Sequence, residues 1–405
     1  MIKDRDIIVY GLQPFDLGIA STCKYTALEM SKNNRVLYVN SPLQRSFAMF
    51  HKDLPEVQKR IKILKGEAPD LEQINENMWT LYPRTMAESI NWIKSVSIFN
   101  FFNKINDKRF ARKIKETADK LGFKNYLLFN DNSMITGFYL KELLKPDVFI
   151  YLLRDAVILV PYHAYHGSRL QPQIIAKADI TVTNSDYFAE YARQTNPNSY
   201  MIGQGCDLSR YNDDDGKLEI PGDLKGIKKP IIGYVGFLTE IRLDIEVLVH
   251  IAEHRPDWNL VLVGPEDEAF QKSKLHQLSN VIFLGRKDPS ELAAYIKGFD
   301  VALNPQIVNP ITDINYPLKI DEYLAMGKPT VATKTTFMAY FKDITYLPST
   351  KDEYVIEIDK ALKEDSPELA KKRIAVASSH SWGNFVDKIY NHINDLYKKR
   401  QQNNH

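Results

Sequence analysis

Short apolar runs alternate with longer amphipathic stretches along most of this chain. In the first half, the runs lie at residues 7–10, 36–39, 126–129, 148–151 and 180–183. Residues 18–32, between the first two runs, have the spacing of a helix with one apolar face. Strands that alternate with helices form parallel sheets, because each helix returns the chain to the same edge. The pattern therefore predicts an α/β domain.

The alternation resumes after a polar segment near the middle of the chain. Apolar runs that end in glycine or proline lie at residues 231–236, 259–265, 281–285 and 300–305. The segment before them is rich in acidic residues, proline and glycine, a composition typical of linkers. We predict an N-terminal domain over residues 1–210, a linker over 211–229 and a C-terminal domain over 230–380, followed by a helix within 381–405.

Residues 315–332 have the pattern of a loop, a helix, a turn and a strand. Pro317 suits the first turn of the helix, and Gly327 suits its C-terminal cap. The loop then directs free backbone amides and the positive end of the helix at one point, which favours a phosphate. Lys319 adds a positive charge, and Glu322, close to one turn further on, can reach a sugar hydroxyl. This combination fits a nucleoside diphosphate.

The same stretch, which reads Pro-Leu-Lys-Ile-Asp-Glu-Tyr-Leu-Ala-Met-Gly-Lys-Pro-Thr-Val-Ala, resembles the donor-site signature of GT-B glycosyltransferases in the group around family 4. These are the group 1 glycosyltransferases of polysaccharide and glycolipid synthesis. Many members carry a second glutamate eight positions before the one matched by Glu322. Here that position is Ile314, and Asp313 is one residue away. An ordinary α/β helix that carries Lys and Glu is the alternative interpretation.

The resemblance implies the GT-B fold, an α/β architecture of two Rossmann-like domains with parallel sheets that face a central cleft. The N-terminal domain would hold the acceptor, the C-terminal domain would hold the nucleotide-sugar, and the helix within 381–405 would cross back to the N-terminal domain. Arg242 matches the basic residue that such enzymes place on the donor phosphates, and the base lies against the loop that carries Arg286. The implied donor-binding residues are Gly236, Arg242, Gly264, Arg286, Asn315, Tyr316, Pro317, Leu318, Lys319 and Glu322.

Asp155 is the candidate catalytic residue. It follows a predicted strand, and the carboxyl ends of strands face the ligand in open α/β sheets. Relatives often have an aspartate after this strand. The alternative interpretation is a carboxylate that pairs with Arg154 or caps the next turn.

Further candidates for the acceptor side follow other strands of the first half. They are Gly11, Gln13, Asp16, Asp131, His163 and His166. Either histidine could instead be an ordinary surface residue. The turn at residues 11–16 lacks the spaced glycines of a dinucleotide-binding fingerprint, so we do not interpret it as an NAD site.

Charge and cysteine content exclude several classes of protein. The net charge of +2 argues against nucleic-acid binding that depends on overall charge. Cys23 and Cys206 are the only cysteines, which argues against a disulfide framework or a zinc site. The run Asp213–Asp215 contains the Asp-x-Asp pattern that binds metal in GT-A glycosyltransferases, but here it lies in the linker and is interpreted as a solvated turn. We expect no metal and no cofactor beyond a nucleotide-diphosphate sugar as co-substrate.

The expected location is the cytoplasm, because residues 1–6 are charged and no run approaches the ~18 apolar residues of a membrane span. Residues 92–115 mix aromatic and basic side chains at helical spacing, so this helix could lie on the inner face of the cell membrane. Alternatively, its aromatic residues pack on the sheet and its basic face is solvated.

We therefore expect a glycosyltransferase of hexosyltransferase type that moves a sugar from a nucleotide-diphosphate donor to a glycan or lipid-linked acceptor in cell-surface polysaccharide synthesis. The resemblance also implies retention of configuration without a metal. Two alternatives remain: a sugar-nucleotide epimerase of the same fold, and a degenerate GT-B subunit that only binds a partner. Ile314 keeps the degenerate subunit open as an alternative, whereas Arg242, Lys319 and Glu322 argue against it.

Overall fold

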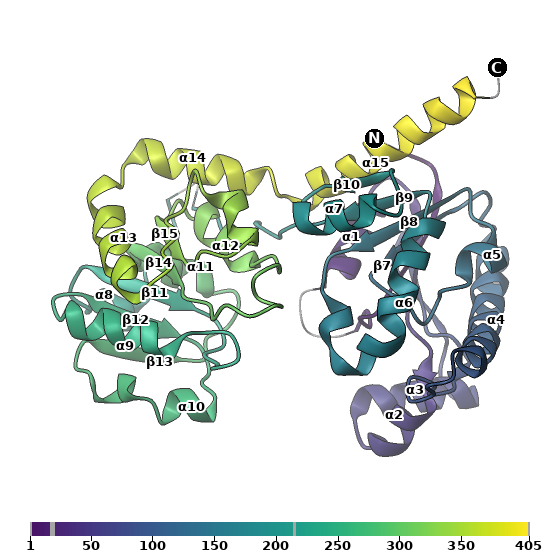
Figure 1. Ribbon diagram of the computed structural model, residues 1–405, viewed down its shortest axis with the longest axis horizontal. Coiled ribbons are helices and arrows are strands. Elements are labelled where there is room, and N and C mark those ends of the chain that lie inside the picture. The colour runs from purple at the N-terminus through teal and green to yellow at the C-terminus, as the bar shows by residue number, and fades with distance from the viewer. Residues whose placement is uncertain (1, 17–20, 214–215, 404–405) are drawn as a thin grey trace. The chain divides into compact units, whose positions relative to one another are not determined.

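The computed structural model describes residues 2–16, 21–213 and 216–403, which form two compact units (Figure 1). The first unit comprises Met1–Gly205 together with Trp382–His405, and the second comprises Cys206–Ser381. The chain therefore passes between the units at residues 205–206 and again at residues 381–382.

The first unit is built on an eight-stranded sheet of order β10-β9-β8-β7-β1-β2-β5-β4. Every neighbouring pair is parallel except the β4–β5 hairpin at one edge. The strands are β1 Asp6–Gly11, β2 Arg35–Val39, β4 Leu71–Asn75, β5 Met78–Leu81, β7 Leu127–Asp131, β8 Val148–Leu153, β9 Ile180–Thr183 and β10 Ser199–Met201. A separate two-stranded pair joins β3 Leu43–Gln44 to β6 Met86–Ala87.

Helices cover both faces of this sheet. On one face, α1 (Thr22–Met30) and α15 (Trp382–Gln402) pack on side chains that alternate along β1 and β2. On the other face, Tyr10 of β1 meets Phe110 of α4 (Val96–Lys120) edge to face, with ring centroids 5.2 Å apart. The remaining helices are α2 Arg45–Phe50, α3 Pro55–Lys65, α5 Leu140–Leu144, α6 Pro161–Lys177 and α7 Asp186–Arg193.

Asp107 is the buried acid of α4. Its carboxylate accepts the amide of Gly137 at 2.8 Å and the amide of Tyr139 at 2.9 Å, which ties the helix to the loop after β7. Burial raises the pKa of Asp107 to about 7, and the two amide hydrogen bonds oppose that shift.

The second unit is a five-stranded parallel sheet of order β13-β12-β11-β14-β15. Its strands are β11 Ile231–Val235, β12 Asn259–Val263, β13 Val281–Gly285, β14 Val301–Asn304 and β15 Thr330–Ala332. One face is covered by α11 (Leu292–Gly298) and α12 (Leu318–Ala325), and the other by α9 (Ile245–His254) and α13 (Lys351–Glu364). Two short helices, α8 Gly222–Lys225 and α10 Glu268–Gln271, and α14 Pro367–Ser378 complete the unit.

The segment predicted as a linker over residues 211–229 lies within the second unit. Tyr211 and Leu224 are buried in its apolar core. The division at residues 205–206 therefore comes before the predicted boundary at 210, because two apolar side chains of the polar segment pack on the sheet. Asp213 forms an ion pair with Lys297 at 2.5 Å, whereas Asp214 and Asp215 lie outside the described residues.

Candidate functional site

Two glycine turns define the carboxyl edge of the second sheet. Gly236 follows β11 with φ +143°, and Gly264 follows β12 with φ +150°. The amide of Gly236 donates to the carbonyl of Val263 at 2.8 Å. A Cβ atom at Gly264 would lie only 1.8 Å from the carbonyl oxygen of Gly236, so the two turns pack backbone to backbone. Only glycine fits this conformation and this contact.

Helix α12 brings a cation to the same edge. Pro317 is its N-terminal cap, and Gly327, at φ +68°, ends it. The Nζ atom of Lys319 lies against the turn that contains Gly236, since a Cβ built on Gly236 would be 2.6 Å from this nitrogen. The same ammonium lies 5.3 Å from the ring centroid of Tyr234. No described carboxylate lies within 4.0 Å of Lys319, so this charge is available to an anionic ligand.

Glu322 follows Lys319 on the same helix and is half-buried. Burial raises the pKa of its carboxyl group, while the charge of Lys319 and a hydrogen bond from the hydroxyl of Tyr211 oppose the shift. Tyr211 comes from the polar segment that packs on the second sheet. A carboxylate held beside an ammonium group can accept hydroxyl hydrogen bonds from a ribose whose phosphates contact Lys319.

A buried polar network lies beneath α12. The carboxylate of Asp321 accepts the hydroxyl of Tyr316 at 2.6 Å and contacts Nδ1 of His380 at 2.7 Å. The hydroxyl of Tyr340 lies 3.1 Å from Nε2 of the same histidine. Tyr316 was predicted to bind the donor, but its hydroxyl is directed at Asp321 and anchors the loop before the helix. The sequence analysis missed this network. The available signal was Asp321, an aspartate on the buried side of α12.

The other predicted donor residues are spread along the edge of the sheet. The carbonyl of Arg242 accepts the amide of Ile307 at 2.9 Å, which places its turn beside the loop after β14. Arg286 is exposed after β13, the outer strand. Leu318 is exposed at the start of α12, and the side-chain oxygen of Asn315 is buried without a partner among the described residues. The structure thus brings together Gly236, Gly264, Lys319 and Glu322, whereas neither arginine forms a side-chain hydrogen bond or an ion pair with them among the described residues.

Asp313 lies next to the position where many relatives carry a glutamate, and its carboxylate is bound by Thr336. One of its carboxylate oxygens accepts the amide of Thr336 at 2.8 Å, and the other accepts the hydroxyl of the same residue at 2.7 Å. Ile314 is buried. The acidic position of the family signature is therefore occupied by a core side chain, and the neighbouring acid caps a turn.

In the first unit, Asp155 lies at the carboxyl end of β8 in an ion-pair cluster. Arg154 donates from Nε to Asp131 at 2.7 Å and from Nη1 to Asp155. Asp131 is fully buried, which raises the pKa of its carboxyl group, and the charge of Arg154 opposes that shift. Asp155 is 42% exposed and so remains accessible from solvent. The predicted pairing with Arg154 is present, and the catalytic role of Asp155 stays a prediction.

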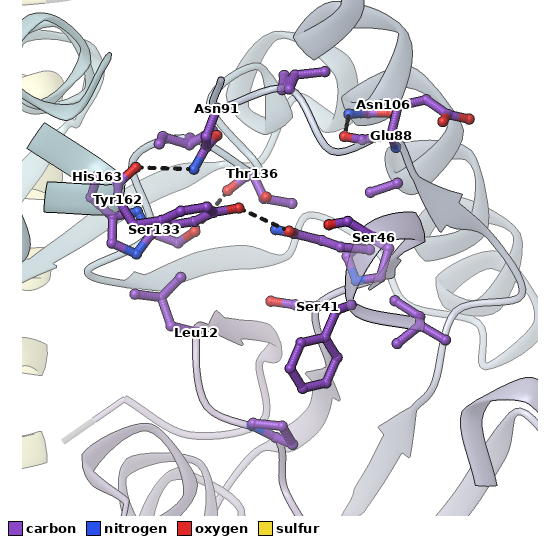
Figure 2. A pocket seen from close by; sticks show the side chains of 18 of the residues that line it. Leu12, Ser41, Ser46, Glu88, Asn91, Asn106, Ser133, Thr136, Tyr162 and His163 are labelled. Carbon is purple, nitrogen blue, oxygen red and sulfur yellow. Dashed lines mark hydrogen bonds between the residues drawn. The ribbon is translucent and has the colours of Figure 1, made fainter. Parts of the chain in front are cut away.

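The first unit also contains a cavity of about 760 Å³. Figure 2 shows Leu12, Ser41, Ser133 and Tyr162 around it, from the turn after β1, the segment after β2, the loop after β7 and the start of α6. Its uncharged polar lining, which the sequence did not identify as a group, includes Ser41, Gln44, Ser46, Asn91, Asn103, Asn106, Asn132, Ser133 and Thr136.

Only some of the predicted acceptor-side residues reach this cavity. Asp16 and His163 line it, and burial lowers the pKa of His163. His166 instead stacks on Phe99 with centroids 3.5 Å apart, inside the packing of α4. Gly11 packs on Cys23, since a Cβ there would lie 2.6 Å from its Sγ atom. The carbonyl of Gln13 accepts the hydroxyl of Tyr38 at 2.6 Å.

Residues 229–364 match the family model described as Glycosyl transferases group 1. The matched residues lie within the second unit. The chain is also 30% identical over 168 residues to TuaH of Bacillus subtilis (strain 168), which is named as a glycosyltransferase of teichuronic acid biosynthesis. This match covers 39% of the chain and 42% of TuaH, so the chain spans less than half of that relative.

Solved structures resemble the whole chain. Sucrose-phosphate synthase from Thermosynechococcus elongatus matches with a TM-score of 0.65 at 16% identity. The match covers 98% of this chain and 100% of the synthase chain. Anabaena HepE in complex with UDP matches with a TM-score of 0.64 at 16% identity. This match covers 96% of this chain and 100% of the HepE chain. These likenesses show the fold, and the predicted GT-B fold is confirmed.

Two other features are absent from the part of the chain that the structure describes. No helix in residues 2–16, 21–213 and 216–403 has the length and apolar character needed to cross a membrane. Within the same ranges, no three His, Cys, Asp or Glu side chains are grouped as metal ligands.

The contact between the two glycine turns is testable by adding one methyl group. Gly264→Ala should raise the dissociation constant for nucleoside diphosphates at least tenfold, because the new Cβ must push the Gly236 turn away from its position under Lys319. Isothermal titration calorimetry measures the effect. Gly226→Ala is the matched control, since a Cβ there meets no atom within 4 Å. Equal affinity of both variants would contradict a ligand at these turns.

Proposed function

We propose that this protein transfers a sugar from a nucleotide-diphosphate donor to an acceptor, with the donor bound at the carboxyl edge of the second sheet. The observation that carries the proposal is the ammonium of Lys319, which has no ion pair among the described residues and is held against the Gly236 turn. Glu322 lies close to one turn further along the same helix, where it suits the ribose. HepE, whose structure resembles this chain, is described in complex with UDP.

The chemistry requires that negative charge on the leaving diphosphate be stabilised as the bond to the anomeric carbon breaks. Lys319 and the N-terminal end of α12 supply that stabilisation, and Arg242 supplies a second cation from the neighbouring turn. The acceptor hydroxyl oxygen forms the new bond to the anomeric carbon and loses its proton late. We propose transfer without a metal, with retention of configuration, and with Asp155 as the catalytic carboxylate.

The acceptor side of the proposal rests on the cavity of the first unit. Its volume of about 760 Å³ is in the range of small-molecule sites, and its amide and hydroxyl groups suit sugar hydroxyls. A site of this kind favours a transferase over the epimerase alternative, which needs no acceptor. TuaH is named for teichuronic acid biosynthesis, so we propose a role in making a cell-surface polysaccharide on a glycan or lipid-linked acceptor.

The sugar-transfer proposal is tested by removing one charge. Lys319→Ala should lower kcat/KM for the nucleotide-sugar about ten- to a hundredfold, because one charge-assisted hydrogen bond is worth ~1.5–3 kcal/mol. Lys342→Ala removes an exposed lysine of the same unit and should leave the rate unchanged. Release of UDP from UDP-sugar is followed with EDTA present throughout. Activity that disappears with EDTA and returns with manganese would contradict transfer without a metal.

We also propose that the first unit works at a membrane surface, as a peripheral protein on the cytoplasmic side. Helix α4 packs Phe99 and Phe110 inward but leaves Ile98, Phe101 and Phe102 exposed. Of its basic residues, Arg109, Arg112, Lys113 and Lys115 have acidic partners. Lys104 and Lys108 have no ion pair among the described residues, so they are available to anionic lipid.

Sedimentation with vesicles tests the membrane role. The parent protein should bind acidic vesicles at low salt and less at high salt, and replacing Lys104 and Lys108 by Gln should weaken binding by ~2 kcal/mol, at about 1 kcal/mol for each charge. Replacing Lys342 in the second unit is the control. If the parent protein remains in the supernatant at low salt, the membrane role is wrong.

A further inference from the structure

A buried aspartate and a buried histidine form a pair beneath α12. The side chains of Asp321 and His380 are 0% and 3% exposed, and Nδ1 of His380 lies 2.7 Å from Oδ1 of Asp321. The rings of Tyr316, Tyr340 and Phe341 surround the histidine, with centroids 5.7–6.5 Å from its own. Burial raises the pKa of the Asp321 carboxyl group, and the contacts with His380 and Tyr316 oppose that shift. Packed apolar side chains in place of such a pair are often equally stable, so stability alone does not explain a carboxylate here.

The aspartate of this pair is directed away from the two charged residues of the candidate donor site. At ~100° per residue, Asp321 lies roughly 130° around α12 from the mid-line between Lys319 and Glu322. Its Oδ2 atom also accepts the hydroxyl of Tyr316, at 2.6 Å, from the loop before the helix. A rotation of α12 that moves Lys319 or Glu322 must therefore break the contacts of a buried carboxylate, which is costly.

The histidine of the pair is itself held from two sides. Its carbonyl accepts the amide of Cys206 at 2.8 Å, which fixes the main chain at His380. Its Nε2 atom lies 3.1 Å from the hydroxyl of Tyr340, in the short helix η3 (Phe337–Phe341). Both ring nitrogens therefore have polar neighbours, and the imidazole can hold Asp321 in one position.

We propose that His380 is a positioning residue of the donor site. Through Asp321, the imidazole sets the rotation of α12 and so the places of Lys319 and Glu322. This inference rests on the proposed function, because it concerns how that donor site is held in its binding geometry. A residue that only stabilises the fold would change the fraction of folded protein and would leave the contacts between α12 and a nucleotide unchanged.

Discrimination between ribose and deoxyribose separates these two roles. UDP, GDP and ADP are compared on the parent protein by calorimetry, and the tightest of them is compared with its 2′-deoxy and 3′-deoxy forms. A deoxy form should bind about three- to tenfold more weakly, because Glu322 loses one hydrogen bond. In His380→Phe, the diphosphate should bind about tenfold more weakly and the discrimination should largely disappear. A smaller folded fraction weakens the binding of all three nucleotides by one factor, so unchanged ratios in His380→Phe would overturn the proposal.

Two further variants separate positioning from folding. His380→Asn places an amide nitrogen close to the position of Nδ1, so this variant should retain most of the affinity and of the discrimination. Asp321→Leu combined with His380→Phe removes both polar groups of the pair and should fold stably. The double variant should still bind the diphosphate about tenfold more weakly and without discrimination, because leucine and phenylalanine pack without a directional bond. A stable double variant with the affinity and discrimination of the parent protein would overturn the proposal.

His250→Phe is the matched control. Nε2 of His250 lies 2.9 Å from Oδ1 of Asp352, on the face of the second sheet that α9 and α13 cover, so this variant should keep both affinity and discrimination. The same measurements let the two proposals fail separately. A parent protein that binds a diphosphate, with equal binding by His380→Phe, overturns the positioning role alone. A parent protein that binds none of the three diphosphates contradicts the donor site and, with it, the positioning role.

Discussion

The close approach of two backbone turns at the carboxyl edge of β11 and β12 is the constraint on which the candidate donor site depends. With a side chain at Gly264, its Cβ would overlap the carbonyl oxygen of Gly236. With a side chain at Gly236, its Cβ would occupy the space next to the ammonium of Lys319. The two glycines therefore let the two turns and the ammonium group approach one another between a strand end and a helix start, the place where α/β sheets commonly bind nucleotides.

The position of Lys319 and Glu322 depends in turn on what lies under their helix. Asp321, between them in sequence, is directed the other way and is held by Tyr316 and His380. A buried carboxylate with two partners resists rotation of the helix, because turning it would leave the charge unpaired. The amide of Cys206 donates to the carbonyl of His380 at 2.8 Å, so this anchor joins the two segments where the chain enters and leaves the second unit.

Much of the fold could be predicted from apolar periodicity, and the failures have physical causes. The runs at 7–10, 36–39, 126–129, 148–151 and 180–183 coincide with β1, β2, β7, β8 and β9, because strands covered on both faces are continuously apolar. The β4–β5 hairpin was missed, since β4 reads Leu-Glu-Gln-Ile-Asn and is exposed at the edge of the sheet. The predicted helix within 18–32 begins at Thr22, and residues 17–20 lie outside the described residues.

The candidate site was predictable only where one segment carries it. Lys319 and Glu322 share α12 and Gly327 ends it, so their spacing along the chain determines how they lie relative to one another. The cavity of the first unit draws on five or more separate segments, and no spacing in the sequence shows that Arg60 faces Ser41. In α4, aromatic residues occur on several sides, so the sequence could not show that Phe99 is buried while Phe101 is exposed.

The most direct test of the donor site is a crystal structure of the protein with UDP. We predict a diphosphate oxygen within ~2.7–3.2 Å of Nζ of Lys319, the pyrophosphate against the Gly236 turn, and the ribose hydroxyls on the carboxylate of Glu322. A nucleotide bound elsewhere, with Lys319 and Glu322 free of contact, would contradict the account.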